Sequence, residues 1–159
     1  MKWFFSHPAA IALIAWILAH AASPVFADDV SDVGQNVRHA SSIADRLKLA
    51  GSNREQIEQA LRKVPDSQRE GMEFLVVHMP ESDLTSLSSE YLLENTRLAY
   101  EAIEEAAWGS DIPKEIFLND VLPYASINER RDQWRADFRR RCLPLIEGAE
   151  SPGAAASLL

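Results

Sequence analysis

The chain contains a single cysteine, Cys142, and its thiol is the first group to consider as a catalytic nucleophile. A nucleophilic thiol needs a lowered pKa, which a nearby histidine or a helix N-terminus supplies. Cys142 instead comes late in a predicted helix, where the helix dipole opposes a thiolate. It follows Trp134 and Phe138 at four-residue spacing, on one apolar face. We therefore expect an inert core cysteine, because buried free cysteine behaves as a small apolar residue.

Metal binding and acid–base catalysis have little support in the residue spacing. Beyond residue 27 the histidines are His39 and His78, in different predicted helices and without a His-x-x-x-His or Cys-x-x-Cys pattern. Glu101, Glu104 and Glu105 share a helix, where acids usually form a solvated face. The few glycines form no phosphate-binding loop. We predict no catalytic, cofactor-binding or metal-binding residue in this chain.

An arginine-rich stretch stands out in a chain whose formal net charge is −8. Its members are Arg130, Arg131, Arg135, Arg139, Arg140 and Arg141. Asp132 is spaced for an intrahelical pair with Arg135, and Asp137 for one with Arg141. The pattern favours a structural role, with the remaining arginines bridging to acidic helices. Binding of an anionic ligand or a partner domain is the alternative.

The elements that would position these residues are helices. After Asn36, apolar residues recur at three- and four-residue intervals, and no run alternates in the manner of a half-buried strand. Gly51 ends the first expected helix, and Pro65 and Pro80 end the second and third. The sequence predicts an all-α bundle of about six short-to-medium helices.

Three later helices follow from similar punctuation. The fourth covers roughly 88–107 and ends at Gly109. The fifth covers 114–122, because Pro113 suits a first helical turn. Asn128 is the expected cap of the sixth helix, which carries the arginine-rich stretch.

Serine residues mark the expected starts of other helices. Two capping boxes are predicted, at Ser52 with Glu55 and at Ser67 with Glu70. Ser151 followed by Pro152 is a favourable N-cap and N1 pair, so a seventh helix is expected to start there. Because no stop signal follows, we expect residues 151–159 to be the start of a truncated helix.

The N-terminus has the order of properties typical of a cleavable secretory signal peptide. Lys2 supplies a positive charge, residues 9–19 are an apolar run, and residues 24–27 offer small side chains to signal peptidase. Cleavage after Ala27 is predicted, which places the protein in the periplasm or outside the cell. A retained membrane anchor is the alternative, but polar residues interrupt the run before the roughly 20 apolar residues of a spanning helix.

The predicted signal peptide, residues 1–27, leaves enough chain for one modest domain. We expect residues 28–35 to be a flexible mature N-terminus and residues 36–150 to form the helical domain. The signal peptide carries Lys2 and no acid, so the mature chain has a formal net charge of −9. This acidity argues against nucleic acid as a partner, because phosphates require a basic surface.

Three blocks of sequence carry a family resemblance. They are REGMEFLVVHMPE at 69–81, SSEYLLENTRLAYEA at 88–102 and EIFLNDVLPYASINERRDQWR at 115–135. These blocks resemble the N-terminal helical region of secreted bacterial transglutaminase-like domain proteins. The resemblance implies a papain-like thiol fold in the whole protein, with a Cys, His and Asp that act on amide bonds. In that family the three residues come after the matched region, so the resemblance assigns no catalytic role to Cys142.

Two hypotheses follow from these patterns. The first is a non-catalytic N-terminal helical portion of a larger α+β transglutaminase-like protein, a cysteine protease or amidase with a peptide or protein substrate. Its partner would be the downstream catalytic half, contacted through a set of polar and aromatic residues. That set is Asn119, Asp120, Tyr124, Asn128, Glu129, Arg130, Arg131 and Trp134. The alternatives are that these residues cap helices and brace the bundle, and that the chain is a stand-alone binding or scaffold module of the cell envelope.

Overall fold

The computed structural model describes residues 43–126 and 129–159, and within these ranges every regular element is helical. The predicted all-α class is therefore confirmed. The helices are α3 (Ile43–Leu49), α4 (Arg54–Lys63), α5 (Arg69–His78), α6 (Glu81–Leu84), α7 (Ser89–Glu105), α8 (Lys114–Ile116), α9 (Trp134–Cys142) and α10 (Pro152–Ala156). A π-helical turn, Phe117–Val121, continues α8 and completes the helix expected at 114–122. Among the described α-helices, the single turn α6 is the one not predicted from the sequence.

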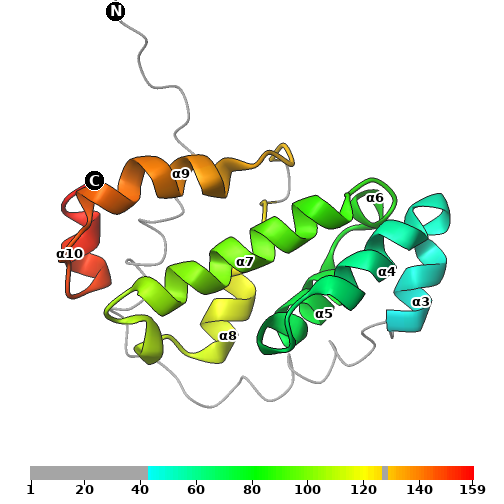
Figure 1. The fold of residues 1–159 in the computed structure, drawn as a ribbon, viewed down its shortest axis with the longest axis horizontal. Coiled ribbons are helices and arrows are strands. Elements are labelled where there is room, and N and C mark those ends of the chain that lie inside the picture. Colours follow the sequence, from blue (N-terminus) through cyan, green and yellow to red (C-terminus); the bar gives the residue numbers. More distant parts are fainter. Residues whose placement is uncertain (1–42, 127–128) are drawn as a thin grey trace, which may run out of the picture.

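The long helix α7 is the centre of the arrangement (Figure 1). Helices α3, α4, α5 and α6 gather at the N-terminal half of α7, and α8 lies below α7 in this view, on the same side as α5. Helix α9 crosses the remaining face of α7, and α10 follows at the far end of the molecule. The amphipathic stripes of the sequence thus converge on one helix, which each of the longer helices contacts.

The core forms where apolar stripes of α4, α5 and α7 meet. Ile57 on α4, Met72 and Val76 on α5 and Leu92 on α7 are fully excluded from solvent. Burying a side chain of this size stabilises the fold by about 1.5–3 kcal/mol. Helix α9 contributes no fully buried residue and lies on the surface of this core.

The start and end signals were predicted with mixed success. Gly51 adopts a positive φ of 55°, as expected of a glycine that ends a helix. The Ser151 side chain accepts a hydrogen bond from the Ala154 backbone amide at 3.2 Å, which confirms the predicted N-cap of α10. Gly109 is required after α7 because a Cβ there would overlap the carbonyl oxygen of Ile103.

Both predicted capping boxes are wrong. Ser52 and Ser67 each lie inside a short 3₁₀ turn that precedes α4 or α5, so neither serine is the N-cap. The N-cap of α4 is Asn53, whose side-chain amide donates to the carbonyl oxygens of Leu84 and Leu87 at 2.9 and 2.8 Å. A tertiary contact that the local pattern does not encode therefore takes the polar side chain at this helix start.

The predicted start of the sixth helix is also wrong. Helix α9 begins at Trp134, and residues 129–133 are not helical. Asn128, the expected cap, lies outside the described residues. The physical reason for the late start is a set of side-chain contacts that hold the preceding segment against the bundle, described below.

Several predictions concern residues that the structure does not describe. The signal peptide at 1–27, the mature N-terminus at 28–35 and His39 all precede residue 43. Within the described ranges, none of the helices has both the length and the apolar character needed to cross a membrane.

Candidate functional site

A buried carboxylate, Asp83 on α6, fastens the segment before α9 to the bundle. The Asp83 side chain is 6% exposed, and the Tyr124 hydroxyl donates to its Oδ2 at 2.8 Å. The Nε atom of Arg131 lies 3.1 and 3.0 Å from the two carboxylate oxygens, and Nη2 lies 3.0 Å from Oδ2. A buried carboxylate requires both a counter-charge and hydrogen-bond donors. Arg131 and Tyr124 supply them from the chain that leads to α9.

Arg135 makes the second attachment. Its Nη2 donates to the carbonyl oxygens of Val121, of Leu122 at 3.1 Å and of Pro123 at 2.7 Å, while Nε donates to Asn95 Oδ1 on α7 at 2.7 Å. The last carbonyls of a helix lack partners within it and favour a nearby cation. Arg135 therefore caps the π-helical turn and fixes α9 to α7 with the same guanidinium group.

Aromatic side chains close the space around these polar groups. The indole Nε1 of Trp134 donates to the Tyr124 carbonyl oxygen at 2.7 Å. The rings of Tyr91 and Tyr124 meet edge to face at 5.6 Å, and those of Trp134 and Phe138 at 5.7 Å. The Arg135 guanidinium lies 4.6 Å from the Trp134 ring centroid, within the range of a cation–π contact. The apolar cover excludes water and strengthens the polar contacts beneath it.

Burial and hydrogen bonding shift the pKa values of the ionisable groups in this network. It raises the pKa of the Tyr91 hydroxyl to about 12, and it raises the pKa of Tyr124 further, with the hydrogen bond to Asp83 acting in the same direction. The bond to Asp83 raises the pKa of Arg131, whereas burial lowers the pKa of Arg135. At neutral pH both guanidinium groups remain charged and both phenols remain protonated donors.

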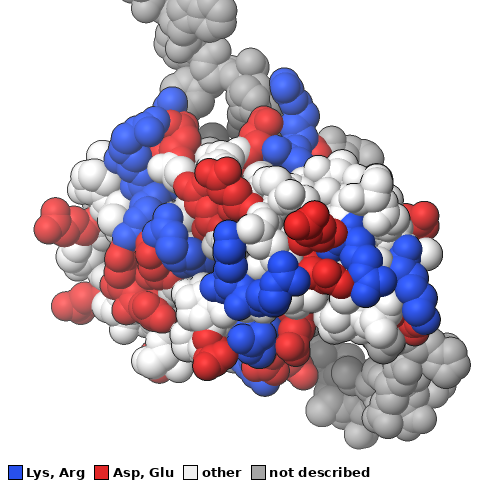
Figure 2. Space-filling view, turned by 45° about the vertical axis from the view of Figure 1, so that its right-hand side comes forward, with Lys and Arg blue, Asp and Glu red and all other residues white. Residues whose placement is uncertain are grey.

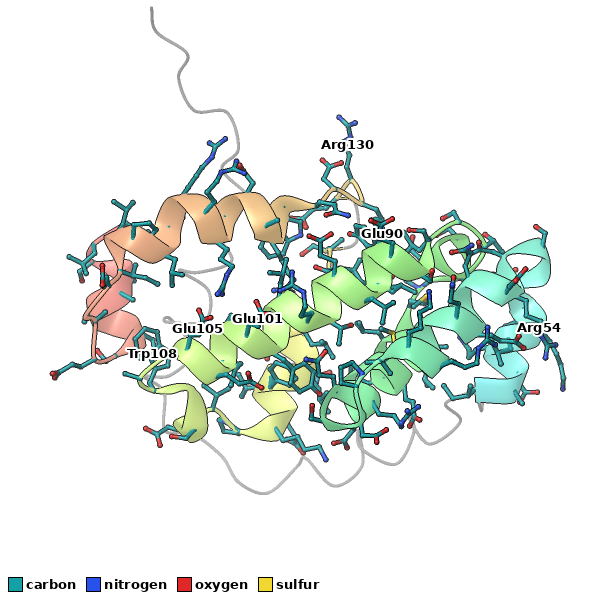
Figure 3. All side chains as sticks on the ribbon, in the orientation of Figure 1. Arg54, Glu90, Glu101, Glu105, Trp108 and Arg130 are labelled. Carbon is teal, nitrogen blue, oxygen red and sulfur yellow. The ribbon has the colours of Figure 1, made fainter. Side chains whose placement is uncertain are left out.

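The residues predicted to contact a catalytic partner include some that brace the bundle and some that are exposed. Tyr124 is buried and Arg131 is bound to Asp83, so these two brace the bundle. Trp134 is half-buried through its contact with Tyr124. Arg130, by contrast, projects away from the bundle (Figure 3).

The remaining members of that set make local contacts or lie at the surface. Asn119 is exposed, and its side-chain amide donates to the Glu115 carbonyl oxygen at 2.9 Å. Glu129 Oε2 accepts from the Ser126 backbone amide at 2.9 Å. Asp120 is half-buried, and Asn128 lies outside the described residues. The set is therefore not one surface patch.

The side-chain acceptors of this network, Asp83 and Asn95, were not predicted from the sequence. A signal for Asp83 was present, because Met79, Asp83 and Leu87 are spaced by four residues and all three are buried. An acid that interrupts an apolar stripe indicates a buried charge with a partner elsewhere. Asn95 carries no such signal, since polar residues are common beside the apolar stripe of a helix.

The predicted structural role of the arginine-rich stretch is confirmed for Arg131, Arg135 and Arg139. Arg139 Nη2 pairs with Glu105 Oε1 at 2.5 Å and lies 3.9 Å from Glu101 Oε2. Both glutamates project from α7 toward α9 (Figure 3). The bond to Glu105 raises the pKa of Arg139.

Of the two predicted intrahelical pairs, one is wrong and one is confirmed. The expected contact of Asp132 with Arg135 is wrong, because Arg135 turns inward to backbone carbonyls. Asp137 does pair with Arg141, at 3.0 Å, and also with Arg140. Ion pairs of this kind mix the two charges at the surface. Figure 2 shows acidic and basic side chains interleaved over the face that it displays.

An open groove of about 380 Å³ lies between α7 and the C-terminal half of α9. Its walls carry the three guanidinium groups of Arg97, Arg139 and Arg140, and its apolar surface includes Leu98 and Leu143. The groove lies beyond the first turn of α9, which Arg135 fixes to α7, and beside the Arg139 contacts with Glu101 and Glu105.

Cys142 and His78, which were first considered for chemistry, do not form a site together with other polar side chains of the described residues. Cys142 is half-buried at the end of α9, so the predicted place in the core is wrong. It is not enclosed because α9 rests on α7 through its first turn and its arginines. His78 is exposed, and its ring lies tilted against that of Phe74, with the ring centroids 4.4 Å apart. Among residues 43–126 and 129–159, no three His, Cys, Asp or Glu side chains are grouped as metal ligands.

Comparison of the chain with models of known protein families, with curated proteins and with solved structures finds no match.

Replacement of the buried carboxylate, Asp83→Asn, should lower the free energy of unfolding by about 2–4 kcal/mol, because the half-buried Arg131 would lose its counter-charge. Asp132→Asn is the matched control, since Asp132 is exposed and only its backbone carbonyl contacts the network, through Tyr91 at 3.4 Å. Urea unfolding followed by circular dichroism measures both. Equal stability of the two variants would show that the pair does not brace the fold.

The three tyrosines should ionise above their ordinary pKa near 10 in the folded chain, because burial raises the pKa of Tyr91, Tyr100 and Tyr124. Above pH 10 the folded state then binds more protons than the unfolded state, so the free energy of unfolding falls as pH rises. Arg135 acts in the opposite sense, because its pKa is lowered, whereas the raised pKa values of Arg131 and Arg139 act in the same sense as those of the tyrosines. Tyrosinate absorbance of the native and urea-unfolded chain measures the effect, and coincident titration curves would contradict it.

Proposed function

We propose that this chain is the non-catalytic, N-terminal helical portion of an exported transglutaminase-like protein. The sequence blocks at 69–81, 88–102 and 115–135 are the origin of this proposal. In it, the complete protein is a cysteine protease or amidase that acts on amide bonds of a peptide or protein. The helical region serves as a rigid unit against which the catalytic half packs.

The observation that carries the non-catalytic role is the use of the polar side chains at 121–135. Arg131 and Arg135 direct their donors inward, to a carboxylate and to helix-end carbonyls, and Tyr124 donates to the same carboxylate. Groups held in this way stabilise a scaffold. They are not free to bind a substrate or to transfer a proton near neutral pH.

The contact with the catalytic half is proposed at the surface that this network supports. Arg130 is its exposed member in the predicted set. Tyr124 and Arg131 act as positioning residues, because they fix the loop from which Arg130 projects.

The second candidate function is a stand-alone binding or scaffold module of the cell envelope. The groove between α7 and α9 favours it, because a binding module needs a concave surface with apolar and charged groups. An exported location is common to both proposals.

Reading the gene beyond codon 159 tests the first proposal directly. We expect the same reading frame to encode a Cys, a His and an Asp, in the context of a transglutaminase-like domain. A stop codon at that point, together with cooperative unfolding of the exported chain, would favour the binding module instead.

Export is tested by the N-terminus of the protein after expression in a bacterium. We expect the chain to start at Asp28, because the residue before the cut must be small and Ala27 meets that requirement. Ala27→Arg should leave the precursor uncut. Phe26→Tyr is the matched control, since the side chain at that position is not read, and it should be processed normally. An unprocessed wild-type chain would contradict the proposal.

A further inference from the structure

The groove between α7 and α9 concentrates positive charge in an acidic chain. Its lining includes Arg97, Arg139 and Arg140 and no carboxylate. The acids that pair with these arginines, Glu101, Glu105 and Asp137, lie outside the lining. The three guanidinium groups of the lining thus face three carboxylates, but Asp137 is shared with Arg141, which lies outside the lining, so the charge of Arg140 is only partly balanced.

The guanidinium groups keep hydrogen-bonding capacity for a ligand. Each arginine has five N–H donors. Arg97 and Arg140 each use one donor in the contacts shown, and their side chains are 50% and 72% exposed. Exposed ion pairs of this kind contribute little to stability, so a ligand carboxylate can join or replace the existing partner at small cost. Two arginines on facing helices can therefore hold two carboxylates of one ligand.

Apolar side chains line the same groove and continue beyond it. Leu98 forms part of the lining, and Leu143 and Pro144 form one end. Leu143 is 41% exposed, and Leu145, two residues later and outside the lining, is 56% exposed. Leu143 therefore gives the groove an exposed apolar side chain beside its guanidinium groups.

From this combination we propose that the groove binds an acidic peptide segment that carries apolar side chains. Charge complementarity fixes the sign of the ligand, and the apolar end selects a segment with leucine-like residues between its acids. The space between two helices, about 380 Å³, accepts a few side chains of a linear segment. The binding does not depend on whether a transglutaminase-like domain follows the helices.

The test is fluorescence anisotropy of a labelled peptide of about twelve residues, in which acidic residues alternate with pairs of leucines, titrated with the purified exported chain. We expect saturable binding that weakens with added salt. A peptide with Asn and Gln in place of the acids should bind about tenfold more weakly, because charge-assisted bonds to arginine would be lost.

The chain offers a closely matched pair of variants. Arg140 and Arg141 are neighbours on α9, are 72% and 71% exposed, and pair with the same Asp137. Only Arg140 lines the groove. Arg140→Glu should raise Kd about tenfold, whereas Arg141→Glu should change it less than about twofold. Leu143→Ser should weaken binding more than Leu145→Ser, since only Leu143 is in the lining.

Three outcomes would overturn the proposal. The first is absence of saturable peptide binding by a chain whose circular dichroism shows it to be folded. The second is an equal loss in the two arginine variants, which would indicate a general charge effect. The third is binding of anionic phospholipid vesicles in place of the peptide, which would assign the groove to a lipid surface. None of these results bears on the gene sequence beyond codon 159, so the two proposals fail independently.

Discussion

The attachment of α9 depends on one buried charge. Asp83 has almost no access to water, and a carboxylate in such a place costs several kcal/mol unless donors and a cation surround it. Tyr124 and Arg131 meet this requirement, and both belong to the segment between the π-helical turn and α9. Because the requirement can be met only when that segment lies against α6, the carboxylate determines where α9 starts and on which face of α7 it rests.

The fold class followed from the sequence because helix formation here is a local property. Apolar spacing, Gly51 and Ser151 each act within a few residues, and each behaved as expected. The start of α9 did not follow, since its cause lies far away in the chain. Arg131 and Asp83 are 48 residues apart, and no local pattern specifies that they meet.

The candidate site was anticipated only in part, for the same physical reason. The density of arginine indicated bracing, and Arg139 does bridge to Glu101 and Glu105. The groove could not be inferred, because it arises from the angle between two helices and from which arginine side chains remain at the surface. Cys142 shows the limit of helical periodicity, which puts residues on one face but does not say whether another element covers that face.

The arginines at the two ends of α9 make different kinds of contact. Those at the first turn stabilise the fold, and those at the last turn remain available to a ligand. At the first turn, the half-buried Arg135 bonds to uncharged carbonyls and to Asn95, so exchange with a ligand would leave those acceptors unsatisfied. At the last turn, Arg140 bonds to an exposed carboxylate and retains free donors. Ligand binding at the far end can therefore rearrange side chains without loosening the attachment at the near end. A single helix thus combines a fixed anchor with an adaptable surface, which is the arrangement that a binding helix requires.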